Sequence, residues 1–75
     1  MYSTTVTWSS IEDVKKFVDI ANKYMFDIDL CLGRYVINAK SIMGVFSLEL
    51  KEKISLVADC PKDSPFVQDI QVFVV

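Results

Sequence analysis

The first residues of the chain alternate between the two faces of a predicted β-strand. Residues 2–8 are rich in β-branched and aromatic side chains, which favour strands. A period of two places Tyr2, Thr4, Val6 and Trp8 on one face of this stretch. We therefore predict a first strand here.

The pattern then changes to the 3.6-residue period of an amphipathic helix. Ser9 and Ser10 precede the helix, and Glu12 and Asp13 follow them at a spacing of three, so either pair predicts a capping box. We predict a helix of about three to four turns. Its apolar face is formed by Ile11, Val14, Phe17, Val18, Ile20, Ala21 and Tyr24.

A hairpin is predicted next. Residues 27–32 alternate again and place their apolar side chains on one strand face. The pair Gly33-Arg34 predicts a turn, because Gly supports the unusual backbone dihedrals of tight turns. Residues 35–38 form the returning strand.

A short, strongly apolar helix is predicted after the hairpin. Ser41 is a favoured N-cap, since its hydroxyl accepts a bond from an otherwise unpaired backbone N–H. Ile42, Val45 and Phe46 follow at the spacing of one helical face, and Met43 lies on another. One face of so short a helix cannot bury all its large apolar side chains, so we expect at least one to be exposed, Met43 first.

The last third of the chain predicts a strand and a helix. A charged loop precedes residues 54–58, which are apolar enough for a central strand. Ser64 and Pro65 provide the N-cap and first position of a final helix, where the missing proline N–H costs nothing. Its apolar stripe is formed by Phe66, Ile70 and Phe73, with Val67 and Val74 beside them.

The predicted elements follow the order β-α-β-β-α-β-α over residues 1–75. This order predicts one α+β domain, an open-faced β-sandwich in which helices cover one face of an antiparallel four-stranded sheet. Hydrophobic residues make up 52% of the 75 positions, enough to fill a small core, and disorder is therefore not expected.

Charge and composition exclude several classes of function. The net charge is −2 and the eight basic residues are scattered, so we expect no nucleic-acid partner. No apolar run approaches the ~18 residues of a membrane span, and we expect a cytoplasmic protein with no membrane contact. Cys31 and Cys60 are expected to be free thiols, with a single bridge as the alternative. Without histidine, a nucleophile–base pair or a metal-ligand cluster, we expect no enzyme, no metal and no cofactor.

The segment Asn38–Leu48 reads Asn-Ala-Lys-Ser-Ile-Met-Gly-Val-Phe-Ser-Leu. It closely resembles the regulatory-serine segment of HPr, the small phosphocarrier of the bacterial sugar phosphotransferase system. The similarity extends roughly from Phe17 to Asp59, with further matching stretches at residues 21–24, 27–30 and 54–59. The resemblance implies the HPr fold, which has the same element order and packs its helices on one sheet face.

The chain departs from the family where the phosphocarrier chemistry lies. HPr proteins carry phosphate on a His in a Gly-x-His-x-Arg-Pro motif that opens the first helix. This chain has no histidine, and an ungapped count places Ser10 nearest to that position, with Glu12 and Asp13 at the Arg and the Pro. Acids at a helix start complement its dipole and repel phosphate, and a serine phosphate ester is too stable to pass its group onward. We therefore predict that this protein is not a histidine phosphocarrier.

For function, the resemblance implies a regulatory or adaptor protein similar to the catabolite-repression HPr-like proteins of Gram-positive-type bacteria. Ser41 would be phosphorylated by HPr kinase. Lys40, Ile42, Met43 and Phe46 would dock a protein partner, either that kinase or a transcriptional regulator. A purely structural role of Ser41, as a cap worth about 1 kcal/mol over Ala, stays open. The alternative function is a degenerate interaction module that assembles without phosphorylation, and we expect a monomer or weak homodimer.

Overall fold

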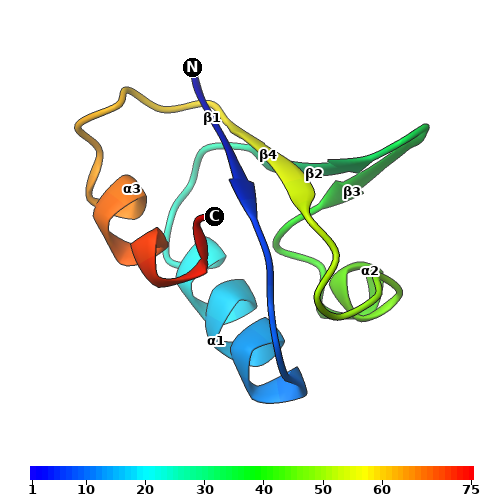
Figure 1. Cartoon of the computed structure of the whole chain (residues 1–75). Helices are drawn as coiled ribbons and strands as arrows, with labels where there is room; N and C mark the ends of the chain where they lie inside the picture. Colours follow the sequence, from blue (N-terminus) through cyan, green and yellow to red (C-terminus); the bar gives the residue numbers. More distant parts are fainter.

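Four antiparallel strands form one sheet in the computed structural model, which describes residues 1–75 (Figure 1). The strands lie in the order β1-β4-β2-β3, so β4 is central, as its apolar sequence predicts. Each neighbouring pair is antiparallel. The strands are β1 (Tyr2–Val6), β2 (Ile28–Leu32), β3 (Tyr35–Asn38) and β4 (Ile54–Ala58).

Three α-helices lie on one face of this sheet, and the other face is open (Figure 1). They are α1 (Ile11–Ala21), α2 (Ile42–Phe46) and α3 (Pro65–Asp69), and α3 is followed by a 3₁₀ turn, η1 (Gln71–Phe73). The predicted α+β class and the β-α-β-β-α-β-α order are therefore confirmed.

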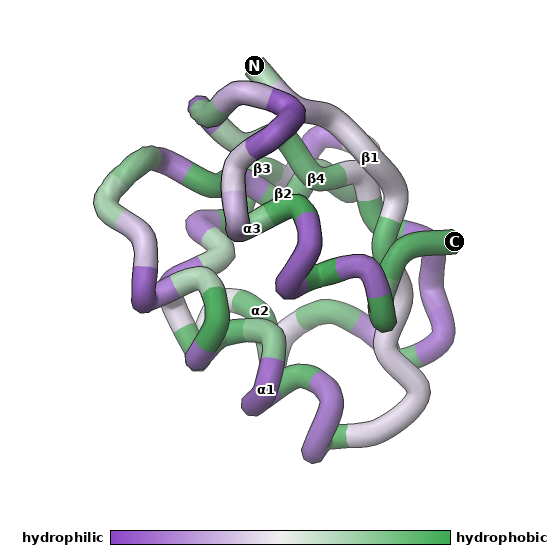
Figure 2. Tube along the Cα trace, turned by 90° about the vertical axis from the view of Figure 1, so that its left-hand side faces the viewer, coloured by the Kyte–Doolittle hydropathy of each residue, from purple (hydrophilic) through white to green (hydrophobic).

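The core lies between the sheet and α1. Alternate residues of the strands point toward the helices and are no more than 1% exposed, namely Val6, Ile28, Leu30, Ile54, Leu56 and Ala58. Val14, Phe17 and Val18 of α1 pack into the same cluster. Figure 2 shows hydrophobic and hydrophilic residues alternating along α1, as its amphipathic period predicts. Full burial of each large apolar side chain stabilises the fold by about 1.5–3 kcal/mol.

The first strand is shorter than predicted, because the chain leaves the sheet to bury Trp8. β1 ends at Val6. The Thr7 amide donates to the Phe73 carbonyl at 2.9 Å. The Trp8 ring, 1% exposed, packs against Phe17 with the ring centroids 5.1 Å apart. The aromatic pair therefore ends the strand at this point.

The first helix has about three turns, as predicted, but Tyr24 does not belong to it. It ends at Ala21, with Asn22 as its C-cap, and Tyr24 lies beyond it. The Tyr24 hydroxyl donates to Asp69 Oδ2 at 2.5 Å, and this hydrogen bond to a carboxylate raises the pKa of Tyr24. Contact with Asp69 at the end of α3 therefore holds Tyr24 outside the helix whose pattern it continues.

The C-terminal helix is interrupted, although the predicted buried positions Phe66, Ile70 and Phe73 are correct. After Ile70 the chain forms the η1 turn, and Val74 then becomes extended and bridges to Val6. This pairing with the end of β1 requires extended backbone, so a continuous helix cannot reach the end of the chain.

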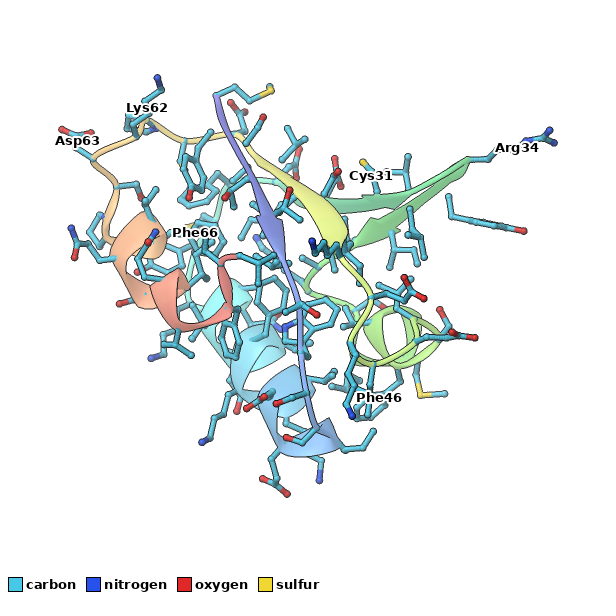
Figure 3. The ribbon with its side chains drawn as sticks, in the orientation of Figure 1. Cys31, Arg34, Phe46, Lys62, Asp63 and Phe66 are labelled. Atoms are coloured by element: carbon cyan, nitrogen blue, oxygen red, sulfur yellow. The ribbon has the colours of Figure 1, made fainter.

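No helix in the structure has the length and apolar character needed to cross a membrane. Both cysteines are free thiols. Cys60 is buried after β4, and Cys31 on β2 is half-buried, with its sulfur on the open side of the sheet (Figure 3). No group of three or more Cys, Asp or Glu side chains is placed to hold a metal ion.

Lys51 is the one non-glycine residue in left-handed backbone, with a φ of 69°. Its amide donates to the Trp8 carbonyl at 2.7 Å, which connects the loop before β4 to the segment between β1 and α1. Left-handed backbone costs a residue with a Cβ roughly 1–2 kcal/mol. The contact with Trp8 therefore holds this loop in a strained conformation.

We expect Lys51→Gly to raise the free energy of unfolding by about 0.5–1 kcal/mol, because glycine relieves the strain but adds entropy to the unfolded chain. Urea unfolding followed by the fluorescence of Trp8, the only tryptophan, measures the change. Lys53→Gly is the matched control, since its backbone is not left-handed, and it should not stabilise the protein. Equal gains in both variants would contradict the strain argument.

Candidate functional site

A tight turn carries the chain from the edge strand β3 to Ser41. Asn38 begins the turn, its side-chain Oδ1 accepting from the Lys40 amide at 2.9 Å and its carbonyl from the Ser41 amide at 3.0 Å. Ala39 is fully buried, and its amide donates to the Ile28 carbonyl at 2.9 Å. The turn is therefore anchored to β2, and Ser41 is left exposed at its end.

Ser41 is the N-cap of α2, as predicted. Its backbone is extended, with φ −92° and ψ 107°, and its Oγ accepts from the Gly44 amide at 3.2 Å. The Val45 amide donates to the Ser41 carbonyl at 2.9 Å. The hydroxyl thus sits on the surface beside the unpaired amides of the first helical turn, where negative charge is stabilised.

Asn22 supports this segment from α1, a role that the sequence pattern did not predict. Its Nδ2 donates to the Val18 carbonyl at 2.9 Å and to the Lys40 carbonyl at 3.1 Å. One side chain therefore caps the end of α1 and holds the backbone immediately before Ser41. The only sequence signal was an amide at the end of the predicted helix.

Gly44 is a second residue whose role the sequence did not reveal. A Cβ at this position would lie 2.8 Å from Ile37 Cγ2 and 3.3 Å from Ser41 Oγ. The absence of a side chain therefore allows α2 to pack closely on β3 and leaves room for the Ser41 cap. This requirement depends on the neighbouring strand and not on the glycine's backbone angles.

Three exposed apolar side chains follow Ser41 and form what we call the α2 patch. Met43 is 77% exposed, Phe46 39% and Ile42 37%, and Phe46 is labelled in Figure 3. Of the large apolar residues on α2 only Val45 is buried, so Met43 is exposed as expected, and Ile42 and Phe46 are exposed as well. A helix of five residues is too short to turn three large side chains inward. Lys40, half-buried, lies immediately before Ser41.

Ser10 lies at the start of α1 and is its N-cap. Its Oγ accepts from the Asp13 amide at 3.2 Å, so the Ser10–Asp13 pair forms the cap and the Ser9–Glu12 pair does not. The Asp13 carboxylate accepts from the Ser9 amide at 3.2 Å and from the Ser9 hydroxyl at 2.9 Å. A carboxylate therefore occupies the place where an anion would approach this helix end.

Solved structures with this fold include HPr phosphocarrier proteins and a catabolite-repression protein. HPr from Bacillus anthracis str. Ames is 22% identical, with a TM-score of 0.74 over 99% of this chain and 96% of that chain. HPr-C-His from Thermoanaerobacter tengcongensis is 22% identical, with a TM-score of 0.75 over 93% and 86%. The catabolite-repression protein Crh of Bacillus subtilis, described as a swapped, intertwined dimer, is 26% identical, with a TM-score of 0.66 over 93% and 87%. The fold and the serine-capped helix thus define an HPr-like open-faced sandwich.

The family assignment rests on a separate sequence comparison. The family model PTS-HPr, described as the PTS HPr component phosphorylation site, matches residues 13–74. The chain belongs to the HPr family, which confirms the resemblance carried by the Ser41 segment. A comparison with curated protein sequences gives no match.

We expect Gly44→Ala to lower the free energy of unfolding by about 1–3 kcal/mol, because the added methyl overlaps Ile37, even though Ala favours helices. Chemical denaturation measures this change. Ile37→Ala removes the opposing methyl, so the double variant should lose less than the sum of the two single variants. Strictly additive losses would contradict direct contact between the two residues.

Proposed function

We propose that this protein is an HPr-like regulatory or adaptor protein that does not carry phosphate on histidine. It docks a partner protein through Lys40 and the α2 patch, and phosphorylation of Ser41 switches this docking. The observation that carries the proposal is the exposed Ser41 hydroxyl immediately before Met43, which is 77% exposed. We place this function in the cytoplasm, where the phosphotransferase-system kinase implied by the family acts.

The chemistry at α1 supports the loss of carrier activity. Members of the HPr family are phosphocarriers and not enzymes, but the residue nearest to the phosphohistidine position is Ser10, and this chain has no histidine. A phosphate ester of Ser10 would not transfer its group readily. Glu12 and Asp13 in the first turn of α1 would in addition repel a phosphoryl donor.

The surroundings of Ser41 are suited to a phosphate ester. A phosphate there brings a charge of about −1.5 to −2 to the amide end of α2, where the Gly44 amide already bonds the hydroxyl. Lys40 lies next to it in the chain. Because the charge is stabilised where it is added, modification would change the docking surface more than the fold.

The α2 patch supports docking to a protein. Its side chains are large and apolar. The turn before their helix is fixed by hydrogen bonds to the Asn22 side chain and the Ile28 carbonyl. Met and aromatic side chains are enriched in protein interfaces, where a few buried anchors carry most of the binding energy. Met43 is the most exposed of the three and its loss should matter most.

Incubation with HPr kinase and ATP tests the switch. We expect mass spectrometry to find one phosphate on Ser41, and none on the Ser41→Ala variant. Ser47→Ala is the matched control, because Ser47 is an exposed serine at the other end of the same helix. Incubation with phosphoenolpyruvate and the first enzyme of the system should give no label. The absence of phosphate on Ser41 removes the switch, and labelling by phosphoenolpyruvate contradicts the loss of carrier activity.

A second candidate function is constitutive self-association through the same patch, without phosphorylation. The related Crh structure is described as an intertwined dimer, so a protein with this fold can self-associate, although by exchange of a segment. Under this alternative, two copies would cover the exposed side chains of α2.

Met43→Asp separates docking from self-association. In the proposed function this change lowers the kcat/KM of the kinase at least about tenfold, since a charge replaces an apolar anchor. Met25→Asp is the control, because Met25 is 98% exposed and lies outside the patch. Light scattering should show a monomer for all three proteins. A dimer that only Met43→Asp disrupts would instead support self-association.

A further inference from the structure

A hollow of about 500 Å³ lies between the β2–β3 hairpin and the loop that follows α2. The hairpin projects beyond α2 to Arg34 at its tip (Figure 3). None of the α2-patch residues lines it. The lining residues are Leu32, Tyr35, Ser47, Leu48, Glu49 and Glu52.

The lining combines apolar, aromatic and acidic groups. Leu32 and Leu48 are half-buried, and the third apolar or aromatic lining residue, Tyr35, is 72% exposed. Glu49 and Glu52 are exposed and carry the only charges of the lining. The lining therefore brings apolar surface together with two negative charges.

No basic side chain of the chain itself lines the hollow. Arg34, which precedes Tyr35 in the chain, extends away from the hairpin tip (Figure 3). Lys51, between the two glutamates in sequence, is absent from the lining. The carboxylates of Glu49 and Glu52 can therefore pair with a cation of another molecule, and their negative charge complements a positive group.

We propose that this hollow binds an arginine side chain on a segment of a partner protein. The arginine stem covers the apolar wall, and its planar guanidinium stacks on the Tyr35 ring and donates hydrogen bonds to the glutamates. A volume of this size accommodates a side chain together with part of its neighbours. This binding is independent of phosphorylation at Ser41 and of docking at the α2 patch.

A titration of the full-length ¹⁵N-labelled chain with the peptide acetyl-Gly-Arg-Gly-amide tests the proposal. We expect NMR shift changes concentrated on the residues that line the hollow, and little effect from the citrulline analogue, which has the same shape without the charge. The Glu49→Gln/Glu52→Gln variant should weaken binding about fivefold or more. Glu12→Gln, an exposed carboxylate on α1, is the matched control and should bind as the parent does.

Two outcomes would overturn the proposal. One is equal binding of the arginine and citrulline peptides, and the other is a set of shifts spread over all exposed carboxylates. Tyr35→Leu keeps an apolar wall but removes the ring, so unchanged affinity in that variant would exclude stacking. Met43→Asp should leave the peptide's affinity unaltered, which distinguishes failure at the hollow from failure at α2.

Discussion

The anchoring of Ala39 to the sheet is the constraint on which the positions of Ser41 and the α2 patch depend. Its side chain is fully buried and its amide bonds the Ile28 carbonyl, so the chain is fixed to β2 one residue before Lys40. Asn22 then holds the Lys40 carbonyl from the end of α1. Because β2 and the end of α1 both hydrogen-bond the backbone here, Ser41 is exposed and its position is also fixed.

The shortness of α2 explains why the surface beside Ser41 is apolar. The helix has five residues and buries only Val45, so its remaining large side chains have no core position to fill. A longer helix would have divided the same side chains into a buried face and a polar face. The exposed patch thus results from the short helix that connects β3 to β4, and not from an irregularity in the sheet.

Local periodicity was sufficient to predict the order of elements and the open-faced sandwich, and it placed Ser41 and Met43 on an exposed, capped helix. It failed where a distant contact ends an element. Tyr24 continued the helical pattern but is held by Asp69, 45 positions away in the chain. Asn22 could not be assigned a role, because its second acceptor comes from a different element, 18 positions away. Such contacts depend on which elements become neighbours, information that the period of one segment does not contain.

The close packing of Gly44 on Ile37 has a consequence for how this surface can evolve. The two positions lie on different elements, yet a side chain at one requires a smaller side chain at the other. They should therefore co-vary among relatives, as residues in direct contact do. Ile42 and Met43 lie on the exposed side of the same helix, so this size constraint does not apply to them. The exposed side chains of α2 can thus change while the glycine–isoleucine pair keeps the helix packed on β3.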